Sequence, residues 1–161
     1  MSLHYIVDGY NAIGRFPAFE GKTLRESRRR LCAFLEGRRP HGSVRNKLTV
    51  VFDGSARVAA GEEPWPFEVV YSVGEKADDV ILARVRAARQ PKNCVVVTDD
   101  KALAFIVRKY GAAAVSVAYF LGAAAAARQA RPQETAQRLY PDVAARERIT
   151  REMARIWLKK E

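Results

Sequence analysis

Short apolar runs alternate along the chain with longer stretches in which apolar positions recur at helical spacing. The runs at residues 3–7, 48–52, 67–72, 94–98 and 113–117 predict β-strands, the third of them near a sheet edge. Most of these runs are apolar on both faces, and they alternate with amphipathic segments. Because this arrangement is typical of a parallel sheet covered on two sides, the pattern predicts an α/β fold with a mainly parallel sheet.

The segments between the strands predict helices over residues 23–37, 77–88 and 99–109. The first begins with Thr-Leu-Arg-Glu, the sequence signature of a capping box, and is expected to end at Gly37. Residues 8–21 carry glycine and proline and are expected to form a loop.

The carboxyl-terminal part of the sequence is rich in alanine and then in basic residues. We expect one domain over residues 1–130, followed by a basic helical extension over residues 131–161 that packs on the same domain. No internal repeat divides the sequence further.

The composition narrows the class of protein. A chain of 161 residues with 48% hydrophobic residues can bury a core without disulfides. We expect a cytoplasmic protein without a membrane partner, because no apolar run approaches a membrane span and the start does not resemble a signal peptide. The two cysteines lie far apart in apolar segments, which favours a reducing compartment.

The charge balance indicates the partner. Lys and Arg number 28 against 18 Asp and Glu, a net charge of +10, which favours a polyanion such as nucleic acid. Tyr10 is a candidate for stacking on a base of single-stranded RNA. Several basic residues are candidates for phosphate contact, although each of them could instead simply face the solvent. The basic candidates for phosphate contact are Arg15, Lys22, Arg25, Arg29, Arg38, Arg39 and Lys76.

Acidic residues follow the predicted strands. Asp8, Asp53 and Asp99 come directly after strands, and Asp78 lies at the start of a helix. In a parallel sheet these positions share one edge, so Asp8, Asp78 and Asp99 are expected to converge, with Asp53 nearby. Clustered carboxylates need a counter-charge, and oxygen ligands suit Mg²⁺ or Mn²⁺.

Each of these residues also has a purely structural role open to it. A single aspartate at such a position is more commonly a turn former or a helix cap, and Asp53 is the weakest of the set. Asn11 could hold a water or a substrate phosphate beside Asp8, or form an Asx-turn. His4 is expected to pack in its strand and His41 to be solvated in a basic loop, so neither is assigned a role.

Four motifs in order carry a resemblance to a known family: IVDGYNAIG, VVFDG, GEKADDVI and VVTDDKAL. Over essentially the whole chain, the sequence resembles the YacP-like NYN domain of the PIN-like nuclease superfamily. The resemblance implies a Rossmann-like, PIN-type three-layer α/β/α domain with divalent-metal-dependent endoribonuclease activity. It also implies mRNA cleavage and association with the ribosome.

Carried over motif by motif, the resemblance assigns residues to roles. Asp8 is implied as the first acidic ligand, with Asn11 beside it, and Asp78 and Asp99 as the second and third. Asp53 matches the family's Phe-Asp element after the second strand. Many PIN domains have a glutamate in the middle of the constellation, and its absence here leaves the number of metals open.

The resulting hypothesis is an endoribonuclease with Asp8, Asn11, Asp78 and Asp99 as catalytic residues and Mg²⁺ or Mn²⁺ on the aspartates, Asp53 included. One alternative is a non-catalytic RNA- or ribosome-binding PIN-like module. A second is a phosphatase or nucleotide hydrolase, although the sequence has no Gly-rich phosphate loop of the Walker type.

Overall fold

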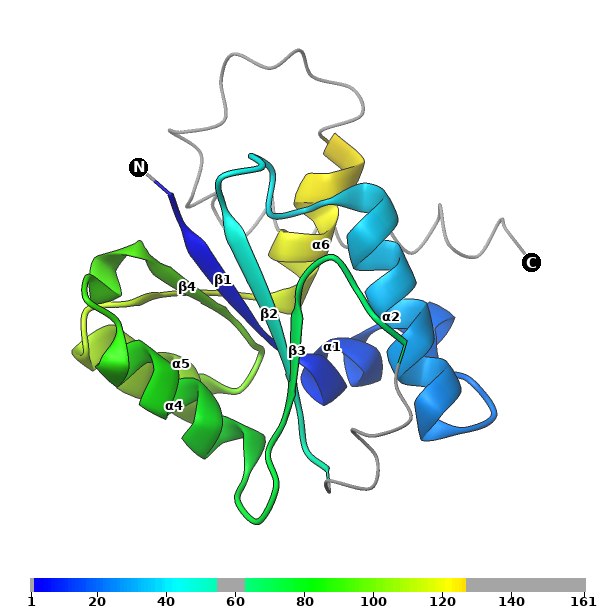
Figure 1. Cartoon of the computed structure of the whole chain (residues 1–161), viewed down its shortest axis with the longest axis horizontal. Coiled ribbons are helices and arrows are strands. Elements are labelled where there is room, and N and C mark those ends of the chain that lie inside the picture. The colour runs from blue at the N-terminus through cyan, green and yellow to red at the C-terminus, as the bar shows by residue number, and fades with distance from the viewer. Residues whose placement is uncertain (1, 55–62, 127–161) are drawn as a thin grey trace.

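The computed structural model describes residues 2–54 and 63–126 and contains a five-stranded sheet between helices (Figure 1). The strand order is β3-β2-β1-β4-β5, and every neighbouring pair is parallel, as predicted. The elements are β1 (His4–Asp8), α1 (Gly9–Arg15), η1 (Pro17–Phe19), α2 (Leu24–Arg38), β2 (Lys47–Phe52), β3 (Glu68–Tyr71), α4 (Ala77–Ala87), η2 (Pro91–Asn93), β4 (Cys94–Val97), α5 (Lys101–Lys109), β5 (Ala113–Val115) and α6 (Val117–Ala126).

The sheet divides the core into two layers. Alternate residues of β1 point to opposite faces, so Val7 packs with α1, α2 and α6 while Ile6 packs with α4 and α5. Figure 1 shows these two groups of helices on opposite sides of the strands. The predicted three-layer α/β/α architecture is therefore confirmed, and β1, in the middle of the sheet, delivers Asp8 to the centre of one edge.

A variant of the predicted capping box forms at the start of α2, in which Glu26 reaches the amide before the N-cap residue Thr23. The Thr23 hydroxyl accepts a hydrogen bond from the Glu26 amide (3.1 Å), and the Glu26 carboxylate accepts one from the Lys22 amide (2.8 Å). The helix runs past Gly37 to Arg38, and Arg39 takes the left-handed conformation (φ 49°) that ends it.

Residues 8–21 are not the loop that the sequence pattern predicted. The chain turns from β1 directly into α1, and η1 follows. With seven residues and two glycines, α1 is too short for its apolar spacing to show in the sequence. The strand predicted over residues 113–117 is also shorter than expected. It ends at Val115 as β5, because α6 begins at Val117.

His41 is buried, with 8% of its surface exposed, so the expectation that it is solvated was wrong. The loop that carries it is fixed to β1, because Asn46 donates to the His41 carbonyl (2.7 Å) and accepts from the Leu3 amide (2.9 Å). This bridge closes the basic loop over the starts of the strands.

The predicted carboxyl-terminal extension and its boundary at residue 130 lie outside the described residues and remain predictions. Within residues 2–54 and 63–126, no helix has the length and apolar character needed to cross a membrane.

Candidate active site at the carboxyl-terminal edge of the sheet

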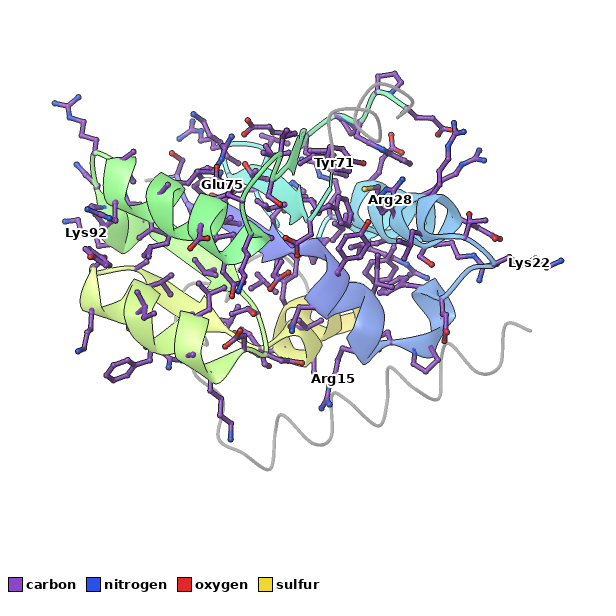
Figure 2. The ribbon with its side chains drawn as sticks, turned by 90° about the horizontal axis from the view of Figure 1, so that it is seen from below. Arg15, Lys22, Arg28, Tyr71, Glu75 and Lys92 are labelled. Carbon is purple, nitrogen blue, oxygen red and sulfur yellow. The ribbon has the colours of Figure 1, made fainter. Side chains whose placement is uncertain are left out.

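The carboxyl-terminal ends of the parallel strands bring the acidic residues to one edge of the domain. Asp8 is the last residue of β1, Asp53 follows β2, and Asp99 follows β4 after Thr98. Asp78 is the second residue of α4, which starts at the same edge. Figure 2 views the molecule from this side, with α1 in front and α4 beside it.

Asp8 has the most perturbed environment of the four. The residue is 8% exposed, and the pKa of its carboxyl is raised from 3.8 to about 6, mainly by burial and then by the charges of Asp78 and Asp53. The Asn11 backbone amide and the Thr98 hydroxyl, whose Oγ1 lies 3.4 Å from Asp8 Oδ2, stabilise the charged form and offset part of the rise. Asp8 is thus a carboxylate with negative neighbours, and no cation of residues 2–54 and 63–126 is among the charges that shift its pKa.

Asp78 is affected by the same cluster. Burial raises the pKa of the Asp78 carboxyl, and the charges of Asp100, Asp53 and Asp79 raise it further, while Lys76 lowers it. Asp8 and Asp78 therefore share one region of negative potential, which is part of the convergence expected of Asp8, Asp78 and Asp99.

Asp53 also has a structural task. Its Oδ1 accepts hydrogen bonds from the Ser72 hydroxyl (3.1 Å) and from the amide of Ala77, the first residue of α4 (2.7 Å). Asp53 therefore ties the end of β2 to the start of α4 and holds the neighbouring Asp78 at the edge. Asp53 therefore has the structural role open to it in the sequence, and it also lies near Asp8 and Asp78, whose pKa values its charge raises.

Asp99 makes contacts that set it apart from the other three. Its Oδ1 accepts from the Val117 amide at the start of α6 (3.0 Å), and its Oδ2 lies 3.4 Å from Arg15 Nε. The Asn11 side chain accepts from the Asp99 amide (2.7 Å), so Asn11 joins the β1–α1 turn to the β4–α5 turn. Asp99 lies at the same edge but is held towards α6 and Arg15.

Asp100, the residue after Asp99, links α5 to the acidic edge. It caps α5, accepting from the amides of Ala102 (2.9 Å) and Leu103 (3.1 Å). Its amide donates to the Thr98 hydroxyl (3.1 Å), which in turn faces Asp8. Its charge also makes the largest electrostatic contribution to the raised pKa of Asp78, which no spacing rule would have revealed.

The donor chemistry of this edge fits a hard divalent cation, because its side chains offer carboxylate oxygens that repel one another. The side-chain arrangement does not yet form a coordination sphere. Within the described ranges, no group of three His, Cys, Asp or Glu side chains lies in a position to hold one ion.

Tyr10, predicted to stack on a base, is half-buried in an aromatic row. Its ring lies 5.2 Å from that of Phe52, which lies 5.8 Å from that of Tyr71. The Tyr10 hydroxyl accepts from Arg28 (3.0 Å), a buried arginine whose guanidinium lies over Tyr71; Figure 2 shows the latter two side by side. Tyr10 therefore forms the wall beside Asp8.

The basic candidates fall into two groups. Arg15 pairs with Asp99, and the charge of Lys76 acts on Asp78, so these two lie at the acidic edge. Lys22 and Arg25 lie at the start of α2 on the same side of the domain, where Figure 2 shows Lys22 at the outer rim. Arg29, one turn along α2, forms an ion pair with Glu63 (3.3 Å). Because α2 runs back along the sheet, Arg38 and Arg39 at its other end lie towards the opposite edge of the domain.

Comparison with known proteins identifies the family of the chain and structures with a similar fold. A protein-family model described as the YacP-like NYN domain matches residues 5–160. The structure is similar to two crystal structures of Rae1 (YacP) from Bacillus subtilis, one of them of a mutant. The mutant matches with a TM-score of 0.62 over 99% of both chains, and the other with a TM-score of 0.61 over 99% of this chain and 84% of that one.

Sequence identity is 22% in both cases, so these neighbours support the fold. No curated protein matches the chain. Because the family match spans nearly the whole sequence, and the fold agrees with it, the chain belongs to the YacP-like NYN domain family, within the PIN-like nucleases.

Proposed function

We propose that this protein is a divalent-metal-dependent endoribonuclease that hydrolyses RNA phosphodiester bonds at the acidic edge of its sheet. The observation that carries the proposal is the state of Asp8. It is a buried carboxyl whose pKa is raised to about 6, partly by the neighbouring Asp78 and Asp53. A protein retains such uncompensated charge at a cost in stability, which is typical of a functional site.

The proposed ligands of a Mg²⁺ or Mn²⁺ ion are Asp8 and Asp78, with Asp53 and Asp99 completing the set. A bound ion would supply an activated water and would neutralise charge on the scissile phosphate. Small rotations of these side chains are needed, because the described residues hold no preformed three-ligand group.

The remaining residues of the site orient these carboxylates. Thr98 contacts Asp8 and accepts from the Asp100 amide, so it fixes the distance between the β1 and β4 ends. Asn11, in the β1–α1 turn, holds the backbone of Asp99 because its side chain accepts a hydrogen bond from the Asp99 amide. We assign Asn11 a positioning role in addition to the predicted contact with water or phosphate.

Binding of single-stranded RNA is proposed to use the basic residues at this edge, with Arg15, Lys22, Arg25 and Lys76 nearest and Arg29 beside them. Arg38 and Arg39, farther along α2, would contact a longer RNA. The net charge of +10 supports a polyanion partner. Cytoplasmic messenger RNA on the ribosome is the proposed natural substrate, which co-sedimentation with ribosomes would test.

The direct test is cleavage of end-labelled single-stranded RNA with Mn²⁺ or Mg²⁺ by the wild type and by Asp8→Asn, with RNA binding recorded in the same samples. We expect internal cuts that fall at least about a hundredfold in rate in Asp8→Asn while binding persists. Asp79→Asn is the matched control, because Asp79 carries the same charge as Asp8 and follows Asp78 on α4 but is exposed.

Cleavage that survives Asp8→Asn unchanged would contradict the assignment of the site. Binding without cleavage by either protein, on RNA alone and on translating ribosomes, would favour the alternative of a non-catalytic RNA-binding module.

A further inference from the structure

A second polar site lies at the opposite edge of the sheet from Asp8. A cavity of about 420 Å³ opens beside the first residues of β1, β2 and β3, which contribute His4, Lys47 and Glu68. The rest of its polar lining comes from the loop, from β2 and from α4, namely His41, Asn46, Thr49 and Arg84. The volume falls within the range of small-molecule sites, and none of these residues takes part in the proposed nuclease site.

His41 is the least satisfied polar group of this cavity. Only 8% of the surface of His41 is exposed, and its Nδ1 has no hydrogen-bond partner among the described residues. The loop that carries it is fixed by Asn46, so the backbone of His41 is held in place. A buried ring nitrogen without a partner is costly, and a ligand oxygen that reached Nδ1 from the cavity would supply the missing partner.

His4 belongs to a chain of hydrogen bonds that fixes its tautomer. Glu68 accepts from Arg84 through both oxygens (2.7 and 2.8 Å), so it is an ionised acceptor. Thr49 therefore donates its hydroxyl hydrogen to Glu68 (3.0 Å) and must accept from His4 Nε2 (2.7 Å). Arg84 and Glu68 neutralise each other within this chain.

The field in the cavity is positive. Burial, then the charges of Arg84 and Lys47, lower the pKa of His4, against an opposing contribution from Glu68. Burial and the charge of Arg39 lower the pKa of His41. Glu68 is engaged by Arg84, so the charges of Lys47 in the lining and of Arg39 near His41 leave this end of the cavity positive.

We propose that this cavity binds the phosphate group of a phosphomonoester, with His41 and Lys47 donating to its oxygens. A phosphomonoester carries close to two negative charges at pH 7, which Lys47 in the lining and Arg39 near His41 would attract. The volume exceeds that of inorganic phosphate, and Phe67 and Leu48 offer an apolar wall for the organic part. The source of the phosphate is a free mononucleotide or the 5′ end of an RNA.

The chain allows a clean test, because it has only two histidines and both line the cavity. Imidazole NMR signals of the untagged protein are recorded at fixed pH while inorganic phosphate, AMP, or a 5′-phosphorylated RNA is added, with acetate and the 5′-hydroxyl RNA as controls. We expect saturable shifts of the His41 signal with AMP or the phosphorylated RNA. The stronger of these two ligands identifies the source.

Two variants guard against misfolding. Lys47→Gln alters an exposed side chain and is expected to weaken binding about tenfold, and His41→Gln by a similar factor. Lys92→Gln, outside the cavity, and Asp8→Asn, at the other edge, are expected to bind as the wild type does. The Asp8→Asn result separates this proposal from the nuclease proposal.

Absence of saturable shifts with all the phosphate probes would overturn the proposal. So would equal affinity of Lys47→Gln and the wild type, or equal affinity for acetate and AMP.

Discussion

At the scale of single residues, Asp8 connects stability to the proposed function. Its carboxyl is buried among other carboxylates, so the ionised form destabilises the folded chain unless a cation is bound. Removing the charge and adding a metal should therefore both stabilise the protein.

The first prediction concerns Asp8→Asn in metal-free buffer. The pKa of Asp8 is raised from 3.8 to about 6 on folding, so ionisation costs stability as pH rises through this interval and the full cost applies at pH 7. Asp8→Asn should raise the free energy of unfolding at pH 7 by about 1–3 kcal/mol. The gain should vanish below about pH 4. Denaturant titrations at both pH values, with EDTA, measure it; an equal gain at both would refute the charge explanation.

The second prediction concerns metal addition. Mn²⁺ at ten times its dissociation constant should stabilise the wild type by about 1.4 kcal/mol, visible as a higher Tm. Asp8→Asn should show a much smaller shift, and Asp79→Asn should respond as the wild type does. A shift of the same size in all three proteins would place the ion elsewhere.

The sequence identified the acidic edge because strand-end aspartates must gather there in a parallel sheet. The sequence could not show which of these carboxylates also hold neighbouring helices in place. Asp53 and Asp99 bind the starts of α4 and α6, and Asp100 acts on Asp78, through contacts with residues about 20 positions apart or more. Such contacts depend on tertiary packing, which local pattern does not record.

At the scale of elements, the β1–α1 turn sets the position of Asp8. Gly9 follows Asp8 directly, and a Cβ at this position would lie 2.2 Å from the Phe52 ring. The aromatic row of Tyr10, Phe52 and Tyr71 can therefore pack against the turn only because Gly9 has no side chain.

The third prediction compares two glycines of α1. Gly9→Ala should lower the free energy of unfolding by about 1–3 kcal/mol, because Phe52 must shift. Gly14→Ala should be neutral or stabilising by up to about 1 kcal/mol, since nothing lies within 4 Å of its added Cβ. Urea unfolding of both variants measures the difference, and equal effects would show that the close approach does not matter.

The fourth prediction concerns the start of α4. Asp53→Ala removes the acceptor for Ser72 and Ala77 and should cost about 2 kcal/mol, whereas Asp53→Asn, which keeps a carbonyl oxygen, should cost less. Chemical unfolding of both variants tests this. A loss with Asp53→Asn as large as with Asp53→Ala would contradict the capping role.

Elements were predictable to different degrees. The strands and the long helices follow from apolar periodicity and capping, which act locally. By contrast, α1 was missed because its two glycines and short length hide any period, and it is held by packing against α2 and β2 instead.

At the scale of the whole molecule, net charge should govern RNA affinity. The fifth prediction is that the dissociation constant for single-stranded RNA rises steeply with salt. Lys22→Gln with Arg25→Gln should reduce the slope of log K against log salt by about 1.4, for two phosphate contacts. Arg89→Gln with Lys92→Gln, at the far edge, should leave the slope unchanged. Fluorescence anisotropy at four salt concentrations suffices, and equal slopes would remove α2 from the RNA path.

The fold class was predictable as a whole, because alternating strands and helices allow few other arrangements. The cavity around His41 was not predictable. It arises where a loop, three strand starts and α4 meet, and the basic loop sequence suggested exposure instead.

The central claim is metal-dependent hydrolysis at Asp8, and analysis of the cleavage products tests it most directly. RNA is incubated with wild type or Asp8→Asn, with Mn²⁺ or with EDTA, and the new ends are identified by mass spectrometry. Attack by water leaves no 2′,3′-cyclic phosphate, so we predict metal-dependent cuts without cyclic ends, absent from Asp8→Asn. Cuts that persist in EDTA with cyclic phosphates, or that Asp8→Asn makes equally well, would contradict the account.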